Sequence, residues 1–270
     1  MDDIVRAIIL GLVQGTTEFL PISSSGHLML FPWVLGWDPH SLTFDVALHL
    51  GSLLAVLTYY HRDFLRLAHS FGQGLRERRF RGYPYRVMSL LIILGTIPAA
   101  AAGFVFETRV EAMNERPTLI ATFLVVTGIL LLLARLGRGR RTVERMGWRD
   151  AITVGIGQAF AIIPGISRAG ATITFGVFRG LAPHESARFS FYLSVPIILG
   201  AGIGQSLQAA DEVQAGLGPI ALVAGMLTAA ISAFIAIHIL LKLMASRRIS
   251  IFAFYCFTLA GFIFALAWLR

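Results

Sequence analysis

Six apolar runs, each about 20 residues long, constrain this chain more than any other feature. They lie at about residues 42–61, 87–107, 118–136, 186–208, 218–242 and 249–269. A helix needs roughly 20 predominantly apolar residues to cross the hydrocarbon core of a bilayer. Only 14% of the 270 residues are charged and the mean hydropathy is +0.73, whereas about 25% of the residues of a soluble domain are charged. We therefore expect an all-α polytopic membrane protein in which residues 1–270 form a single membrane domain.

Two further apolar stretches, 3–36 and 151–181, are too broken to be simple spans. Pro21, Pro164, several glycines and polar clusters interrupt them. Each is better interpreted as two short helices that meet at an irregular tip, forming a re-entrant hairpin that enters and leaves the bilayer on one side. Irregular backbone at membrane depth is tolerated only where it is buried in protein or lines a cavity. The sequence therefore predicts six transmembrane helices plus two re-entrant helical hairpins.

The arginines predict which side each connection occupies. The net charge is +8 and 22 of the 23 basic residues are arginine, concentrated in the short connections. This distribution indicates membrane topology and no nucleic-acid partner. The arginine-rich connections 62–86 and 135–149 and the basic turn at 242–248 should be cytoplasmic, whereas the acidic stretches at 107–116 and 211–212 fit the outside. Both termini are then outside, the first hairpin dips in from the outside and the second from the cytoplasm, and no cleavable signal peptide is expected.

The order of elements contains an internal repeat. Each half is one broken hairpin followed by three spans, and an odd number of spans inverts the second half. The first repeat covers about 1–136 and the second about 150–270, and QGTTEFLPISSSG at 14–26 resembles QAFAIIPGISRAG at 158–170. In inverted-topology repeats the functional site forms where the two discontinuous helices meet near the midplane. The residues that this would bring together are Glu18, Ser24, His27, Ser167 and Arg168.

The second tip carries Arg168 within IIPGISRAGAT. A guanidinium keeps its charge and its planar fork suits phosphate oxygens, so an anion clamp is one interpretation. The other interpretation is that Arg168 pairs with Glu18 or extends to the membrane interface. Gly165 and Gly170 should free backbone N–H groups at a helix start, where anions bind readily.

The first tip offers groups that complement a cation or an activated hydroxyl. Gln14 and Glu18 are four residues apart and share a helix face. A serine hydroxyl becomes a nucleophile when a neighbour such as His27 or Glu18 takes its proton. Alternatively, Glu18 and Gln14 could hold a hard divalent cation through oxygen ligands, and the serines could simply cap a helix. Asp45 and His49 also share a helix face, and we favour a structural role for them over lining the cavity.

Two motifs connect the chain to a known family. QGTTEFLPISSSGH and PGISRAGAT resemble the two signature motifs of the bacterial undecaprenyl-diphosphate phosphatase family associated with bacitracin resistance, and the resemblance runs through nearly the whole chain, including TFDVALHLGSLLAV and ARFSFYLSVP. The first motif has an E/QxxxE pattern followed by a serine and a histidine. The second motif is usually PGxSRSGxT, and Ala169 replaces its second serine.

The resemblance implies that the protein removes the terminal phosphate from undecaprenyl diphosphate. It also implies a divalent cation, Mg²⁺ or Ca²⁺, a location in the bacterial inner membrane with the active site opening to the periplasmic face, and a homodimer. The residues expected to be catalytic are Glu18, Ser24, His27 and Arg168. Those expected to bind substrate are Gln14, Ser23, Ser25, Gly165, Ser167, Gly170 and Thr172, and those expected to hold the metal are Glu18 and Gln14.

Several alternatives stay open at the level of sequence. Our mechanistic hypothesis is attack by Ser24 on the terminal phosphorus with His27 as base or acid, while a rival hypothesis makes His27 or a metal-bound water the nucleophile. The second function class is a polyprenyl-phosphate flippase or secondary transporter, since inverted repeats with broken helices are the architecture of many transporters. A purely structural membrane scaffold would leave the buried polar cluster unexplained.

Overall fold

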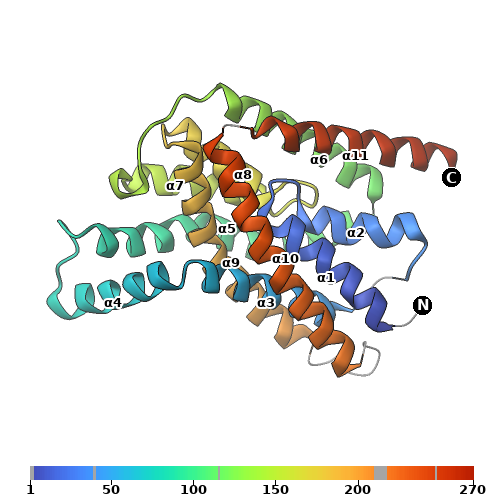
Figure 1. The fold of residues 1–270 in the computed structure, drawn as a ribbon, viewed down its shortest axis with the longest axis horizontal. Coiled ribbons are helices and arrows are strands. Elements are labelled where there is room, and N and C mark those ends of the chain that lie inside the picture. The colour runs from blue at the N-terminus through green and yellow to red at the C-terminus, as the bar shows by residue number, and fades with distance from the viewer. Residues whose placement is uncertain (1–2, 39–40, 115, 210–217, 247) are drawn as a thin grey trace.

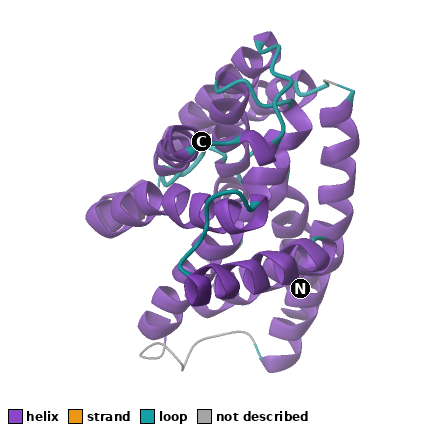
Figure 2. Ribbon diagram, turned by 90° about the vertical axis from the view of Figure 1, so that its left-hand side faces the viewer, coloured by secondary structure: helices purple, strands orange, loops and turns teal. Residues whose placement is uncertain are grey.

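A computed structural model describes residues 3–38, 41–114, 116–209, 218–246 and 248–270 (Figure 1). All regular secondary structure in these residues is helical, and Figure 2 shows that loops contribute little of the described chain. In the first half the helices are α1 Asp3–Phe19, α2 Ser24–Leu35, α3 Leu42–Tyr59, α4 His61–Glu77, α5 Pro84–Asn114 and α6 Pro117–Leu136. After the 3-10 turn η1 Val143–Arg145 follow α7 Trp148–Phe160, α8 Arg168–Phe178, α9 Pro183–Ala209, α10 Pro219–Ala245 and α11 Ser250–Leu269.

Six helices are long and apolar enough to cross a membrane. They are α3, Pro84–Phe106 of α5, α6, Pro183–Gln205 of α9, α10 and α11. Each coincides within a few residues with one of the six apolar runs of the sequence, because in lipid a run of apolar side chains with all backbone groups bonded internally can only be a helix. The prediction of an all-α polytopic membrane protein is confirmed.

The two broken stretches form helix pairs joined by irregular tips. Residues 20–23 connect α1 to α2, and residues 161–167 connect α7 to α8. In Figure 1 the tips of both pairs lie in the middle of the molecule, and the two termini lie at the same end. The re-entrant path of these pairs through the bilayer stays a prediction.

The first helix of each pair packs into the opposite half of the chain. α1 packs chiefly on α10 and α7 chiefly on α5, while α3 contacts α9 and α6 contacts α11. Exchanging the halves exchanges these contacts, while the division into two repeats stays a prediction. A Cβ added at Gly11 of α1 would collide with the Gly225 carbonyl of α10, and one added at Gly155 of α7 would collide with the Gly95 carbonyl of α5. Glycine therefore permits both close crossings.

The connection 62–86 is largely helical, because α4 occupies most of it; its cytoplasmic side stays a prediction. α4 and the start of α5 form an arm at the left of Figure 1. Arg86, counted in the sequence only as a topology charge, is buried and donates to Glu77 Oε2 at 2.7 Å and to the Arg79 carbonyl at 2.8 Å. These bonds close the turn between the two helices of the arm.

One of the two acidic stretches expected outside the membrane is helical. α5 continues to Asn114 and so runs through most of the acidic stretch 107–116, whose location outside the membrane stays a prediction. The acidic pair at 211–212 and the basic Arg247 lie outside the described residues.

Candidate active site

A cavity of about 160 Å³ lies where the two tips meet. The first half contributes Glu18 from α1, Ser23, Ser24 and Ser25 from the start of α2, and His49 from α3. The second half contributes Ser167 and Arg168 at the start of α8, and residues 197–205 of α9 supply an apolar wall that ends at Gln205. The structure thus brings Glu18, Ser24, Ser167 and Arg168 together as the sequence predicts.

The first tip places Ser24 at the first position of α2. Ser23 is the N-cap, and its hydroxyl accepts a hydrogen bond from the Gly26 N–H at 3.4 Å. Ser23 has φ +72°, a conformation that non-glycine residues rarely adopt and that is found at functional sites. The backbone therefore turns sharply just before Ser24, and the predicted capping role of these serines is confirmed for Ser23.

The second tip repeats this arrangement. Ser167 is the N-cap of α8, and its hydroxyl accepts from the Gly170 N–H at 3.1 Å. Thr127 of α6 fixes the tip, because it accepts from the Ser167 N–H at 3.0 Å and donates to the Gly165 carbonyl at 2.8 Å. Two helix N-termini, from different halves, therefore face one cavity, and each favours an anion through its dipole and its unsatisfied N–H groups.

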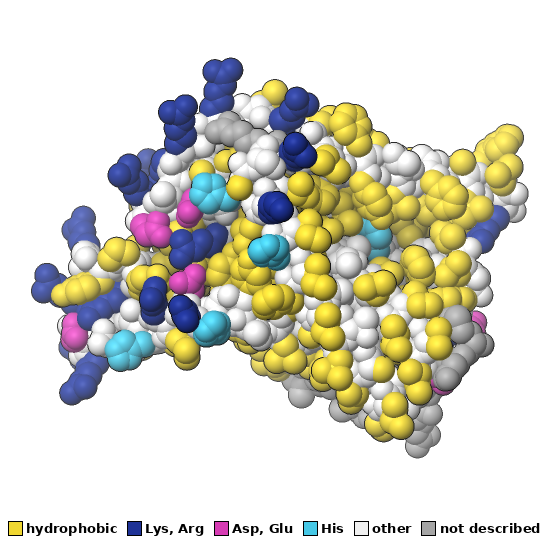
Figure 3. Space-filling view, viewed as in Figure 1, with side chains coloured by type: hydrophobic (Ala, Val, Ile, Leu, Met, Phe, Trp, Pro, Cys, Tyr) yellow, Lys and Arg dark blue, Asp and Glu magenta, His cyan; other side chains and the backbone are white. Residues whose placement is uncertain are grey.

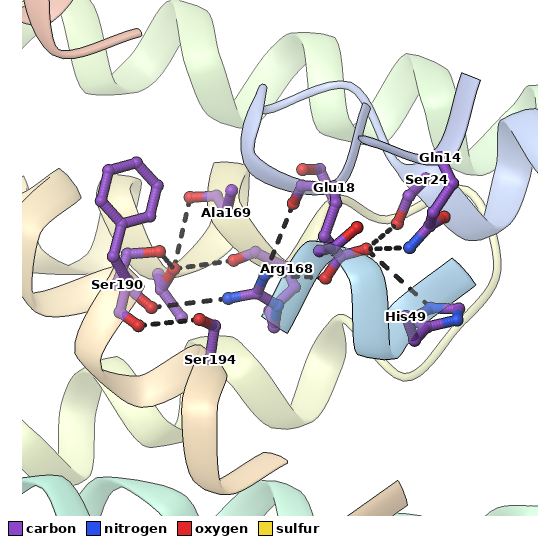
Figure 4. A network of polar contacts seen from close by, with 12 residues as sticks. Gln14, Glu18, Ser24, His49, Arg168, Ala169, Ser190 and Ser194 are labelled. Carbon is purple, nitrogen blue, oxygen red and sulfur yellow. Dashed lines mark hydrogen bonds and ion pairs between the residues drawn. The ribbon is translucent and has the colours of Figure 1, made fainter. Parts of the chain in front are cut away.

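Glu18 is the centre of the polar network in Figure 4. Its Oε2 accepts from the Ser24 hydroxyl at 2.6 Å and from Gln14 Nε2 at 3.1 Å, while its Oε1 pairs with Arg168 Nη2 at 2.9 Å. Glu18 is 7% exposed, so its charge is stabilised by these partners instead of bulk water. The short bond from Ser24 makes Glu18 the acceptor best placed to take the hydroxyl proton.

Arg168 both pairs with Glu18 and lines the cavity. The pairing that the sequence left as an alternative to an anion clamp is therefore present. Arg168 Nη1 also donates to the Ser190 carbonyl of α9 at 3.4 Å. One guanidinium has five N–H donors, so it can keep these contacts and still present donors to an anion in the cavity.

His49 lies in the cavity wall, where the sequence analysis favoured a structural role for it. Its Nδ1 hydrogen-bonds the Asp45 carbonyl at 2.8 Å, and its Nε2 lies 3.9 Å from Glu18 Oε2. It lines the cavity, so the structural role favoured for it is incomplete. The position of His49 on the same face of α3 as Asp45 was the available signal, but only the packing of α3 against α1 shows which face points inward.

His27 lies beside the cavity lining and not within it. Its Nδ1 contacts the Ser23 carbonyl at 2.7 Å and its Nε2 contacts the Tyr255 hydroxyl of α11 at 2.7 Å. The His27 and Tyr255 rings are stacked with centroids 5.6 Å apart. Both ring nitrogens are therefore engaged away from Ser24, and a catalytic role for His27 stays a prediction that this geometry does not favour.

Three residues expected to bind substrate have partners within the protein, and their part in substrate binding stays a prediction. The Gly170 N–H, expected to be free for an anion, is capped by Ser167 because it is the third residue of α8. Gly165 has φ +94°, and a Cβ there would collide with the Ile120 carbonyl of α6. The Thr172 hydroxyl contacts Ser190 Oγ at 2.6 Å behind Arg168. These three residues, like the fully buried Gln14, are not among the described residues that line the cavity.

The donor set fits a divalent cation only if substrate shares it. Among the described residues no group of three or more His, Cys, Asp or Glu side chains could hold a metal. Glu18 supplies carboxylate oxygens, Ser24 a hydroxyl, and Gln14 Oε1 is buried without a hydrogen-bond partner among the described atoms. Mg²⁺ is commonly bound by one or two carboxylates together with substrate phosphates, so this donor set fits such a shared site.

Comparisons with known proteins agree over nearly the whole chain. A family profile described as "Bacitracin resistance protein BacA" matches residues 7–262. The chain is similar to an undecaprenyl-diphosphatase of Rubrobacter xylanophilus, with 41% identity over 98% of this chain and 99% of the relative. It is also 44% identical to an undecaprenyl-diphosphatase of Moorella thermoacetica over 99% of both chains, and 42% identical to one of Geobacter sulfurreducens over 99% of this chain and 100% of the relative.

Proposed function

The chain belongs to the bacitracin resistance protein BacA family, and on this premise we propose that it hydrolyses undecaprenyl diphosphate to undecaprenyl phosphate and inorganic phosphate. Such a reaction recycles the lipid carrier for peptidoglycan synthesis and confers resistance to bacitracin. The observation that carries the proposal is the Ser24–Glu18–Arg168 constellation, in which a hydroxyl, its proton acceptor and a guanidinium meet in one cavity. The names of the relatives, all undecaprenyl-diphosphatases, support the choice of substrate.

In the first step Ser24 Oγ attacks the terminal phosphorus. An Oγ–P bond forms, the P–O bond to the lipid monophosphate breaks, and the hydroxyl proton moves 2.6 Å to Glu18 Oε2. Glu18 thereby loses its negative charge and weakens its hold on Arg168, whose donors then stabilise the phosphoryl oxygens. The two helix N-termini stabilise the same charge, and the lipid phosphate leaves without needing a proton.

In the second step water attacks the phosphorus of the phosphoserine. The P–O bond to Ser24 breaks and Glu18 returns its proton to Ser24 Oγ, while both water protons leave with the inorganic phosphate. A divalent cation, held by Glu18 with Ser24 or Gln14 and by the substrate, would neutralise phosphate charge when bound. Ser23, Ser25 and Ser167 line the cavity and would hold the diphosphate in position.

We propose that the site opens toward the periplasmic face of the inner membrane. α9 starts at Pro183, close to the arginine-rich connection 135–149, since Arg141 N donates to the Gly180 carbonyl at 3.0 Å. The cavity is lined by the far part of that helix, residues 197–205, which leads away from the arginines. Because arginine-rich connections remain cytoplasmic, the cavity would open on the opposite side. A homodimer, which light scattering of the purified protein in detergent would detect, also stays a prediction.

Trapping the phosphoenzyme tests the mechanism. Purified protein is given undecaprenyl diphosphate labelled at the terminal phosphate, quenched within the first turnover, and mapped by mass spectrometry. We expect phosphate on Ser24, its loss in Ser24→Ala, and its retention in Ser25→Ala, which removes a neighbouring cavity hydroxyl. Phosphohistidine at His27, or label retained in Ser24→Ala, would remove Ser24 from the role of nucleophile.

A transporter of polyprenyl phosphates is the second candidate. The packing of α1 on α10 and of α7 on α5, each across the two halves, favours it, because transporter sites form between broken helices of opposite halves. Detergent micelles do not separate two aqueous compartments, and a protein that only transports its substrate would release no inorganic phosphate in them. Release of inorganic phosphate that stops with EDTA supports the phosphatase and its metal; release that persists with EDTA supports the phosphatase alone.

A further inference from the structure

A second hollow lies at the arginine-rich end of the molecule, apart from the active-site cavity. This groove, of about 510 Å³, lies between the C-terminal ends of α6 and α8 and shares no lining residue with the cavity. Its apolar wall includes Leu136 and Phe178, which are 74% and 52% exposed. Arg138 lines the same groove, and Arg135 lines an adjoining hollow that shares Gly137 and Val177 with it.

The floor of the groove is held rigidly. A Cβ added at Gly139 would collide with the Leu181 carbonyl, so the segment after α6 lies directly against the turn between α8 and α9. Arg141 N donates to the Gly180 carbonyl at 3.0 Å, and Ala182 N donates to the Arg141 carbonyl at 2.9 Å. The groove is therefore formed before anything binds, which reduces the ordering cost of a ligand.

Four arginines around the groove form two sets. Arg141 and Arg179 both pair with the buried Asp150 at 2.7 Å and so fix the floor. Arg135 and Arg138 are exposed on the rim, and within the described parts of the chain neither has an ion pair or a side-chain hydrogen bond. Figure 3 shows Lys and Arg side chains gathered at the left and upper left, next to a largely hydrophobic surface.

We propose that this groove binds an anionic phospholipid of the surrounding leaflet. The phosphate would lie between Arg135 and Arg138, and an acyl chain would follow Leu136 and Phe178. Basic pockets between transmembrane helices near the membrane surface suit anionic headgroups, and long apolar side chains exposed beside them suit the chain. Zwitterionic lipid fits less well, because its ammonium would face two unpaired guanidinium groups.

Native mass spectrometry of the whole protein in detergent tests the proposal. The protein is titrated with phosphatidylglycerol or with phosphatidylcholine of identical acyl chains, and bound lipid is counted. Each basic residue near the lipid phosphate contributes about fivefold in affinity, so the double substitution Arg135→Gln with Arg138→Gln should reduce the preference for phosphatidylglycerol about 25-fold. The charge-preserving pair Arg135→Lys with Arg138→Lys should retain most of it.

The matched control is Arg76→Gln with Arg81→Gln, which removes two exposed arginines from the α4–α5 arm. It should leave the preference unchanged. Equal binding of both lipids by the wild type, or an undiminished preference in the groove variant, overturns the proposal. An equal loss in groove and arm variants would assign the preference to the whole basic surface, which also overturns it. The assay needs no turnover, so it is independent of the proposed phosphatase activity.

Discussion

Glu18→Gln tests the centre of the proposed site with the smallest change of shape. In the wild type one carboxylate accepts from Ser24 and Gln14 through Oε2 and pairs with Arg168 through Oε1. Glutamine has one acceptor oxygen, so either Ser24 or Arg168 loses its partner. The substitution removes the proposed proton acceptor while leaving the Ser24 hydroxyl and the Arg168 guanidinium in the cavity.

The expected effect on turnover is large and that on stability is moderate. Loss of a general base reduces rates by roughly 10²- to 10⁴-fold, so kcat should fall by that range. Leaving a buried charged group without its partner costs about 3–5 kcal/mol, but Arg168 lines the cavity and its side chain is 13% exposed. Water can therefore reach it, and we expect a loss of about 1–3 kcal/mol.

The assay measures phosphate release, thermal midpoint and protection by inorganic phosphate on the same preparation. Arg168 no longer faces an internal carboxylate in this variant, so inorganic phosphate should raise the midpoint more than in the wild type. The control is Asp63→Asn, which breaks another ion pair, with Arg188 at 3.2 Å, outside the cavity lining. It should lower the midpoint without the loss in kcat. Turnover of Glu18→Gln within tenfold of the wild type would refute Glu18 as the acceptor of the Ser24 proton.

Three further predictions concern other parts of the structure. His49→Leu should raise KM several-fold while His49→Gln retains more activity, because only glutamine keeps a polar group at the cavity wall; equal kinetics in the two variants would argue against a substrate contact. Burial opposes ionisation of Asp150, but hydrogen bonds from Arg141, the Gly147 N–H and Arg179 hold its pKa below the ordinary value, so its contribution to stability is full at neutral pH and is lost as pH falls through that lowered value. Asp150→Asn should therefore lower the thermal midpoint at pH 7 and flatten its decline below about pH 4, and an unchanged acid profile would contradict this. A Cβ at Gly204 meets no atom of the described residues within 4 Å, so Gly204→Ala should stabilise α9 by about 0.5–1 kcal/mol; reduced turnover in this variant would show that the cavity wall must flex.

Much of the fold follows from the sequence because lipid leaves few choices. Long apolar runs must be helices, so all six spans are recovered within a few residues. The broken stretches are recovered as helix pairs because proline and glycine interrupt the apolar pattern. The helix α4 is not among the predicted elements, although Phe64, Leu67, Phe71 and Leu75 recur at the spacing of one helix face. Its position is set by packing on α5 and by the buried Arg86, which the local sequence does not show.

The sequence predicts which side chains form the candidate site, but not which way the two histidine side chains point. Glu18, Ser24 and Arg168 follow from polar groups placed where apolar residues are expected. The orientations of the His27 and His49 side chains cannot be predicted from the sequence, because each depends on contact with a neighbouring helix. Tyr255 of α11 holds the ring of His27, while the packing of α3 on α1 brings His49 beside Glu18.

The two tips share a serine N-cap but contribute different chemical groups to the cavity. Ser23 and Ser167 occupy equivalent positions in the two similar segments 14–26 and 158–170. Each caps a helix whose N-terminus faces the cavity. The next residue differs, Ser24 in one half and Arg168 in the other, so one tip supplies a hydroxyl and the other a permanent cation. Glu18 bridges both at 2.6 and 2.9 Å. Neither half alone contains the hydroxyl, the carboxylate and the guanidinium, so the proposed chemistry depends on the packing of α1 against α10 and of α7 against α5.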